Sequence, residues 1–307
     1  MHIAVIGPGG IGCLFSALLA EAGHEVWLVD RRPDRAALVS CDGLTIEKDG
    51  KTRRVSLRAA AQPAEAGPAE LIILCVKAHE TAGAMPSVAA LSAPHTKVLS
   101  LQNGLGNLEA LKTAVAGGNL FAGITTHGAM VIGLNHVRHA GAGPTFVGAL
   151  SQNKSGAEML AETLTGAGIE TSAAANTIGM LWSKLVINAA ICPVSVLAGL
   201  PNGQLVKDRR WRALMCEAAA EGAGIAAAKG IRLIFPDPAA AVLEVCEKTA
   251  GNISSMLQDV RRGRHTEITA INGAIVRAAA ELSREAPTSA MLCEKVLEIE
   301  KHKEYKD

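Results

Sequence analysis

Three glycines near the start of the chain have the spacing of a phosphate-binding turn. Gly7, Gly9 and Gly12 form the pattern Gly-x-Gly-x-x-Gly directly after an apolar run at 3–6. Glycine allows a tight turn at the first position and close approach of backbone N–H groups to a pyrophosphate at the second. At the third position it lets the following helix pack close to the strand. The pattern predicts a dinucleotide site whose contacts are Gly7, Gly9, Gly10, Ile11 and Gly12; a turn that serves packing alone is the alternative.

Three charged residues follow a second predicted strand at 25–29 and bear on the choice of cofactor. Asp30 stands where an acid accepts a hydrogen bond from the ribose 2′-hydroxyl of NAD. Arg31 and Arg32 come next, and a guanidinium there holds the 2′-phosphate of NADP. Two arginines in a solvated loop are the alternative. We expect NADP(H), and Asp30 keeps NAD(H) open.

Two further polar residues follow predicted strands. The run 70–76 is followed by Lys77, and the run 97–101 by Gln-Asn-Gly, which includes Asn103. Ligands of open α/β sheets bind outside the carboxyl ends of the strands. Lys77 and Asn103 are therefore expected near a bound ligand, with a solvated loop lysine as the alternative for Lys77.

A lysine and an asparagine lie one turn apart in the most apolar predicted helix. Lys184 and Asn188 share a face of the helix 176–197, which is otherwise almost wholly apolar. Burial disfavours the charged form of a lysine and lowers its pKa, which suits a proton donor near neutral pH. A lysine that extends to solvent at the helix end is the alternative.

Two polar clusters later in the chain are weaker signals. Asn252, Ser255 and Asp259 share one helix face, although Asn252 is also a suitable helix cap. Glu267 falls in the first turn of a predicted helix at 267–284, where an acid is favourable to the helix dipole. Spacing alone does not make Glu267 catalytic.

The elements that must position these residues change character near residue 173. Before it, predicted strands alternate with helices, and an Asp-Gly hairpin joins 44–47 to 52–57. This predicts a dinucleotide-binding domain at 1–173, α/β, with a mainly parallel, doubly wound sheet of the Rossmann type. After it we expect an all-helical substrate and catalytic domain at 174–307, with helices at 176–197, 204–229, 238–249, 252–262, 267–284 and 288–302.

Composition excludes several classes of protein. The 307 residues carry a net charge of +1 and only 3% aromatic residues, which argues against nucleic-acid binding. The seven cysteines are scattered without metal-ligand spacing, so we expect no metal and a reducing, cytoplasmic environment. The apolar run 185–200 is too short to span a bilayer, and no membrane association is expected.

Taken together, the motifs resemble those of the ketopantoate reductase (2-dehydropantoate 2-reductase) family. The shared features are the glycine turn, the strand before Lys77, Gln102-Asn103-Gly104, Trp182-x-Lys184-x-x-x-Asn188, Asn252-x-Ser254-Ser255-Met256-x-x-Asp259 and Arg264-x-Thr266-Glu267-Ile268. The resemblance implies NADPH-dependent reduction of 2-dehydropantoate to (R)-pantoate on the route to pantothenate. It implies that Lys184 is the general acid and that Glu267 engages this lysine and a substrate hydroxyl. Lys77 matches a lysine on the nicotinamide side, and the positions that orient substrate or cofactor are Asn103, Asn188 and Ser255, with Asn252 beside them.

One position departs from the family pattern. Members often carry a second asparagine one turn beyond Asn188, and here Cys192 stands there, before Pro193. A thiol is a poor hydrogen-bonding group compared with an amide, so the substrate loses a contact or is a related 2-keto acid. A different hydroxyacid dehydrogenase, or a cofactor sensor without turnover, would fit the same architecture, although retention of Lys184 and Glu267 speaks against a sensor. The partner expected is a small 2-keto acid, and the oligomeric state, including a homodimer, is left open.

Overall fold

The computed structural model describes residues 1–115 and 118–302, and the chain packs into two compact units. The first comprises 1–102 and 107–177, and the second comprises Asn103–Gly106 together with the chain from Ile178. The chain thus enters the second unit briefly after its first hundred residues. The division at 177/178 lies slightly beyond the boundary at 173 that the sequence predicts.

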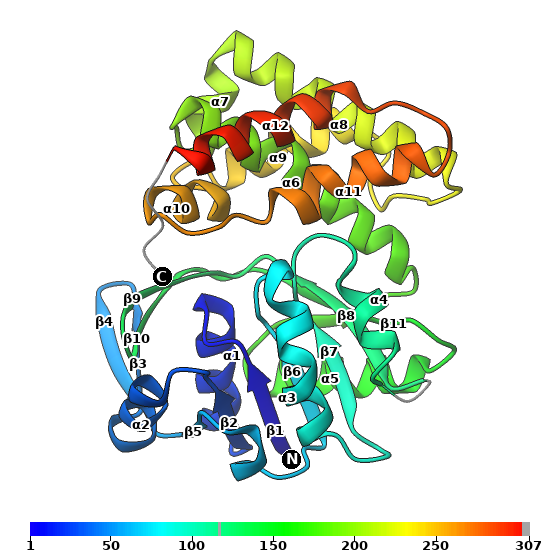
Figure 1. Cartoon of the computed structure of the whole chain (residues 1–307). Coiled ribbons are helices and arrows are strands. Elements are labelled where there is room, and N and C mark those ends of the chain that lie inside the picture. The colour runs from blue at the N-terminus through cyan, green and yellow to red at the C-terminus, as the bar shows by residue number, and fades with distance from the viewer. Residues whose placement is uncertain (116–117, 303–307) are drawn as a thin grey trace. The chain divides into compact units, whose positions relative to one another are not determined.

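A mainly parallel eight-stranded sheet forms the centre of the first unit (Figure 1). All neighbouring strands pair in parallel except β8 and β11, which are antiparallel, so the predicted α/β class is confirmed. In spatial order the strands are β12 (Thr171–Ala173), β11 (Thr145–Ala149), β8 (Leu120–Thr125), β7 (Lys97–Ser100), β6 (Leu71–Leu74), β1 (His2–Ile6), β2 (Glu25–Val29) and β5 (Arg58–Ala60).

Helices cover both faces of this sheet because its central strands are apolar on both sides. In β1, Ile3 and Val5 pack on one face with α1 (Gly10–Glu21), α2 (Pro33–Asp42) and α5 (Lys154–Gly166). Ala4 and Ile6 point to the other face. There they join a core with α3 (Thr81–Leu91) and α4 (Asn107–Lys112), and α3 lies in front of the strands in Figure 1. The doubly wound arrangement follows from this alternation.

The order of the strands reverses between β1 and β6. From β1 the chain continues to β2 on one side, and it later returns to β6 on the other side. Such a switch point opens a crevice at the carboxyl ends of the two strands, where ligands of this architecture bind. The glycine turn follows β1, and Lys77 follows β6 just before the short helix η2 (Ala78–Glu80). The topology therefore places both predicted cofactor segments at this edge.

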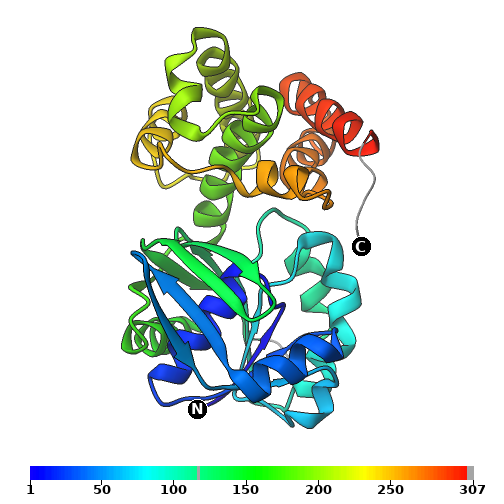
Figure 2. The same ribbon diagram turned by 90° about the vertical axis from the view of Figure 1, so that its left-hand side faces the viewer.

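A separate four-stranded sheet was not predicted from the sequence. It has the order β4 (Lys51–Val55), β3 (Leu44–Lys48), β10 (His136–Gly141) and β9 (Gly128–Gly133), and it packs against α1. The expected hairpin is present, with Asp49 and Gly50 at φ +51° and +73° as a type I′ turn requires. In Figure 2 the blue and green strands of this sheet lie side by side.

The second unit is helical, as predicted, and is organised around one long apolar helix. Helix α6 (Thr177–Ala198) is long and apolar enough to cross a membrane by length and composition, but 78% of its most apolar window is buried inside the structure. Around it lie α7 (Asn202–Lys207), α8 (Arg209–Ala228), α9 (Pro238–Lys248), α10 (Ser255–Arg261), α11 (Ile268–Ala280) and α12 (Pro287–Lys301). Helix α6 contributes residues to both hydrophobic cores of this unit and is its central element.

Three predicted helices have different starts or lengths, for a local reason in each case. The expected helix 204–229 is two helices, because Asp208 accepts hydrogen bonds from the backbone N–H groups of Arg210 and Trp211 and starts α8 anew. Helix α10 is capped by the hydroxyl of Ser254, which accepts from the N–H of Leu257, rather than by Asn252. Glu267 is the cap residue of α11, one position before its first turn.

Candidate active site

The glycine turn after β1 packs against the protein at Gly7 and is exposed at Gly9. Gly7 has φ +107°, and a Cβ placed on it would lie 2.6 Å from the backbone nitrogen of Val76 in the loop after β6. Gly9, the residue before α1, is exposed, and no atom lies within 4 Å of the position its Cβ would occupy. A ligand can therefore reach the N-terminus of α1 over Gly9, where the helix dipole favours an anion.

The two other glycines are required for packing inside the protein. A Cβ on Gly12 would overlap the carbonyl oxygen of Gly7, so Gly12 lets α1 lie close to the turn. A Cβ on Gly10 would overlap the carbonyl oxygen of Ala129, in β9 of the second sheet. Gly10 and Ile11 lie in the first turn of α1, and β9 of the second sheet contacts that turn at Gly10.

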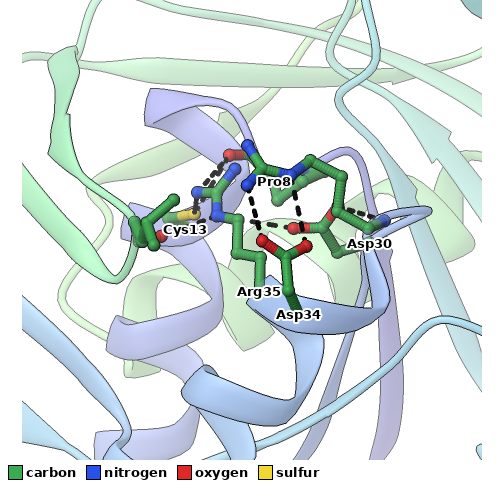
Figure 3. Close-up of polar contacts among 7 residues, drawn as sticks. Pro8, Cys13, Asp30, Asp34 and Arg35 are labelled. Carbon is green, nitrogen blue, oxygen red and sulfur yellow. Dashed lines mark hydrogen bonds and ion pairs between the residues drawn. The ribbon is translucent and has the colours of Figure 1, made fainter.

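Asp30 is turned into the protein, as Figure 3 shows. Its side chain is 4% exposed, its Oδ1 accepts a hydrogen bond from the backbone N–H of Arg32 at 3.0 Å, and its Oδ2 lies 3.4 Å from Nε of Arg35. By contrast, Arg31 and Arg32 have side chains 84% and 52% exposed. The predicted ribose acid thus faces a buried arginine, Arg35, that the sequence analysis did not single out.

Arg31 is tied to the loop that carries Lys77. Its guanidinium forms an ion pair with Glu80 at 3.1 Å, and the same carboxylate accepts a hydrogen bond from the backbone N–H of Lys77 at 3.2 Å. Lys77 is half-buried just beyond the carboxyl end of β6. The two predicted cofactor segments are therefore linked through one carboxylate of η2. Arg32 pairs locally with Asp34 at 2.8 Å.

Lys184 lies on α6 in an environment that favours loss of its proton. Burial lowers its pKa from 10.5 to about 8, and the negative charge of Glu267 opposes this shift. Cys192, two turns further along α6, acts in the same direction as Glu267 but more weakly. A lysine extended into solvent would not show this shift. Lys184 is therefore held near Glu267 with a pKa close to neutral pH.

Glu267 uses its carboxylate for a contact other than capping its helix. Its side chain makes no cap hydrogen bond to α11 and is 5% exposed. Instead Oε2 accepts a hydrogen bond from Nδ2 of Asn103 at 3.1 Å. The structure thus brings together Asn103, Lys184 and Glu267, which are some 80 residues apart at each step of the sequence. An acid with only a helix-dipole role would have no reason to face these groups.

The turn that carries Asn103 lies against the start of α11. Gly104 has φ +80°, and a Cβ on it would lie 2.5 Å from the carbonyl oxygen of Ala270. The N–H of Leu105 donates to that same oxygen at 2.9 Å. Because no side chain separates the two backbones, Asn103 is fixed beside Glu267. Gly104 therefore allows the backbone of this turn to lie close to the backbone of α11.

A residue that the sequence analysis missed holds α11 to α6. Pro193 has no N–H, so the carbonyl oxygen of Ala189, four residues earlier, lacks its normal helical partner. Nδ2 of Asn272 on α11 donates to this oxygen at 3.0 Å, and Asn272 is fully buried. The signal in the sequence was the proline inside an apolar helix, which implies an orphan carbonyl. Asn272 thus joins the helix of Lys184 to the helix that Glu267 begins.

The remaining predicted residues occupy less constrained places in the second unit. Asn188 is half-buried, one turn after Lys184, and Cys192 is buried among apolar side chains that include Trp182. Asn252 and Ser255 are exposed, on the segment before α10 and on its first residue. Among the residues that the structure describes, no group of three or more His, Cys, Asp or Glu side chains could hold a metal ion.

Two family models match the chain. "Ketopantoate reductase PanE/ApbA" covers residues 3–152, and "Ketopantoate reductase PanE/ApbA C terminal" covers residues 176–300. The chain is 36% identical to 2-dehydropantoate 2-reductase of Pyrococcus abyssi, over 95% of both chains. It is 33% identical to the enzyme of that name from Escherichia coli O157:H7, over 96% of this chain and 94% of the relative. The chain belongs to the ketopantoate reductase family.

Solved structures agree with this assignment over nearly the whole chain. A PanE/ApbA family ketopantoate reductase from Ralstonia eutropha JMP134 has a TM-score of 0.89 and 32% identity, and covers 98% of this chain and 99% of its own. D-mandelate dehydrogenase, solved with NADH and anilino(oxo)acetate, has a TM-score of 0.93 and 27% identity over the same shares. The ketopantoate reductase fold therefore also supports an enzyme that is named for another 2-hydroxy acid.

Proposed function

We propose that this protein catalyses the NADPH-dependent reduction of 2-dehydropantoate to (R)-pantoate. The observation that carries the proposal is the environment of Lys184, whose pKa is lowered to about 8 by burial while the charge of Glu267 opposes the shift. A lysine of this kind suits the donation of a proton to an oxygen on which negative charge develops. Membership of the ketopantoate reductase family supports the substrate class and an oxidoreductase activity.

Lys184 is the general acid in this proposal. With a pKa of about 8, roughly nine tenths of the molecules carry the proton at pH 7, and the proton leaves easily. The ammonium group stabilises charge on the keto oxygen and then protonates it. When bound, the nicotinamide cofactor supplies the hydride to the keto carbon. The residues of this chain keep Nζ of Lys184 protonated until the keto oxygen accepts the proton.

Glu267 and Asn103 keep this proton in place. The carboxylate of Glu267 stabilises the charged form of Lys184, and the hydrogen bond from Asn103 fixes the orientation of the carboxylate. A carboxylate accepts hydrogen bonds, and we propose that Glu267 accepts one from a substrate hydroxyl. We propose Asn188, Asn252 and Ser255 as further substrate-binding residues, on the strength of their positions in the family motifs.

The first unit offers a fitting site for a dinucleotide. Gly9 leaves the N-terminus of α1 open, and Lys77 lies at the carboxyl end of the neighbouring strand β6. We propose that Gly7, Gly9, Gly10, Ile11 and Gly12 hold the pyrophosphate. Arg31 and Arg32 favour NADPH over NADH, because their side chains are exposed and can exchange their surface ion pairs with Glu80 and Asp34 for a 2′-phosphate, whereas Asp30 is turned inward. The seven cysteines form no disulfide among the described residues, which is consistent with a reducing, cytoplasmic location.

A second candidate function is the reduction of another 2-keto acid. Cys192 favours it, because a buried thiol among apolar side chains offers a substrate less hydrogen bonding than an amide. The similarity to D-mandelate dehydrogenase favours it as well. The two candidates differ in the group attached to the keto acid, which is a branched hydroxyalkyl chain in one case and an aromatic ring in the other.

Steady-state kinetics separate the candidates. We would measure kcat/KM for 2-dehydropantoate, phenylglyoxylate and 2-oxoisovalerate, each with NADPH and NADH, by the loss of reduced-cofactor absorbance. The proposal predicts the highest value for 2-dehydropantoate with NADPH, and a loss of about 100-fold or more in Lys184→Ala with the fold retained. A higher value for phenylglyoxylate would favour the second candidate. Turnover of none of these acids would refute both.

A further inference from the structure

Asp30 and Arg35 form a buried ion pair behind the glycine turn. The side chains are 4% and 10% exposed, and Nε of Arg35 lies 3.4 Å from Oδ2 of Asp30. Oδ1 of Asp30 accepts from the backbone N–H of Arg32, two residues further on, as in a local turn. Among the residues that the structure describes, none donates a hydrogen bond to Oδ2, and the positive charge of Arg35 balances the charge on this oxygen. An acid at the end of the second strand is normally free to contact the ribose.

Arg35 is held by three separate segments of the chain (Figure 3). Its Nε donates to the carbonyl oxygen of Leu134, between β9 and β10, at 2.6 Å. Its Nη2 donates to the carbonyl oxygen of Pro8 in the glycine turn at 2.8 Å and to Sγ of Cys13 on α1 at 3.4 Å. A guanidinium with several fixed acceptors loses little further freedom when it also pairs with a carboxylate. Arg35 is therefore a rigid cation beneath the cofactor edge.

The buried and the exposed charges at this edge form separate ion pairs. Asp30 and Arg35 are buried, while the side chains of Arg31 and Arg32 are 84% and 52% exposed and pair with Glu80 and Asp34. A 2′-phosphate approaching this surface would meet the exposed cations. The two acids beside these cations are already paired with them. Asp30 is the further acid that would repel the phosphate, and its carboxylate is paired with Arg35 and turned inward. Like charges brought together at a binding surface cost several kcal/mol, so hiding this acid matters for selectivity.

We propose that Arg35 is a positioning residue that sets cofactor selectivity, by holding Asp30 away from the ribose so that the site accepts a 2′-phosphate. The inference deepens the NADP(H) preference of the proposed function and rests on it. Arg35 does not contact the cofactor in this scheme; it acts through Asp30. Without Arg35, the carboxylate would be left buried without a counter-charge, which is strongly unfavourable, and it would turn outward to solvent and to the ribose.

Four proteins test the inference: the wild type, Asp30→Asn, Arg35→Met and the double variant. The Kd of NADPH and of NADH is measured separately from the fluorescence of the reduced cofactor, without substrate. Arg58→Met is the matched control, since Arg58 is an exposed arginine of the first unit, on β5, and pairs with Glu25 at 3.2 Å. Its loss removes one positive charge from the first unit without freeing a buried acid.

The inference predicts a specific pattern of rescue. Arg35→Met raises the Kd of NADPH by about tenfold or more and changes that of NADH far less, because the freed carboxylate repels only the 2′-phosphate. The double variant returns the Kd of NADPH to within about threefold of the wild type, because no acid remains to be freed. Asp30→Asn alone leaves NADH binding within about threefold. The control leaves the ratio of the two Kd values unchanged.

Other patterns overturn the inference. If Arg35→Met weakened the binding of NADPH and NADH equally, and the double variant restored neither, Arg35 would serve only the structure of the glycine turn. Loss of NADH binding by about tenfold or more in Asp30→Asn would mean that Asp30 binds the ribose; this arm decides the matter even when Arg35→Met does not fold. The wild type could bind NADH more tightly than NADPH while Asp30→Asn binds NADH as well as the wild type does. That result would refute the NADP(H) preference but not the placement of Asp30 away from the ribose. A failed reductase assay leaves these Kd values unaffected.

Discussion

Replacement of Glu267 by Gln tests the core of the proposed mechanism. The change removes the negative charge but keeps the size of the side chain and an oxygen that can accept the hydrogen bond from Asn103, 3.1 Å away in the wild type. Folding should survive, because the carboxylate makes no cap hydrogen bond to α11 and a helix-dipole contribution is only about 0.5 kcal/mol. The effect should therefore fall on Lys184 and on catalysis.

The size of the effect follows from what the carboxylate contacts. Hydrogen bonds to a charged group are worth about 1.5–3 kcal/mol, and a loss of about 1.4 kcal/mol in the transition state is a tenfold loss in rate. We expect kcat/KM of Glu267→Gln to fall by roughly 10- to 100-fold. The thermal midpoint should change by no more than a few degrees, given the small contribution to the helix.

The pH dependence gives an independent reading of the same variant. Lys184 must be protonated to act as an acid, so kcat/KM of the wild type should decline as pH rises through the pKa of about 8. Glu267 raises the pKa of Lys184, and its removal must lower that pKa. The alkaline limb of the profile should therefore move to lower pH in Glu267→Gln.

Glu281→Gln is the matched control for this experiment. Glu281 lies at the other end of α11, where it pairs with Lys229 at 2.7 Å at the surface. Its replacement removes one carboxylate from the same helix, and it should leave both kcat/KM and the alkaline limb unchanged. Wild-type kcat/KM together with an unshifted limb in Glu267→Gln would refute the role given to Glu267.

Three further predictions concern stability. Asn272→Leu leaves the carbonyl oxygen of Ala189 without a partner in a buried position and should lower the free energy of unfolding by roughly 1–3 kcal/mol, as measured by denaturant unfolding; an unchanged value would show that the bond is dispensable. Gly10→Ala places a methyl group on the carbonyl oxygen of Ala129 and should cost about 1–3 kcal/mol in the same assay, with retention of full stability as the contrary result. Lys184 releases its proton near pH 8 when folded and near 10.5 when unfolded, so stability should rise across that window by up to about 3 kcal/mol relative to Lys184→Met. Parallel pH curves for the two proteins would contradict this shift.

The elements that local pattern decides could be predicted from the sequence. The strand at 25–29 has the bounds predicted from the sequence, and the turn at Asp49 and Gly50 has the positive φ angles that the residue pair favours. The change from alternating strands and helices to helices alone also identified the fold class. In each case the signal lies within a few residues, where hydrophobic period and turn chemistry act.

The second sheet could not be predicted, because its strands meet across large sequence distances. In its parallel pair, His136 lies opposite Thr45, and nothing in either segment specifies the other. Strand β9 begins and ends with glycine, Gly128 and Gly133, which indicates a loop when the segment is taken alone. Tertiary contact with α1 and β10 makes it a strand. The need for Gly10 follows from the same contact and is equally invisible in the motif.

Glu267 and Asp30 show that motif spacing predicts where an acid lies on the backbone but not which group its side chain faces. Glu267 stands where an acid suits a helix start, yet its carboxylate faces Asn103 and makes no cap hydrogen bond to the helix. Asp30 stands where an acid suits a ribose, yet its carboxylate faces the buried Arg35. In both cases the backbone position follows from the motif, while the group that the carboxylate faces decides the chemistry. For Glu267 this group is an amide 164 residues away in the sequence, and for Asp30 it is a buried arginine in the first turn of α2. The function of an acid in such a motif can therefore be inferred only when the cation or amide that it faces is known.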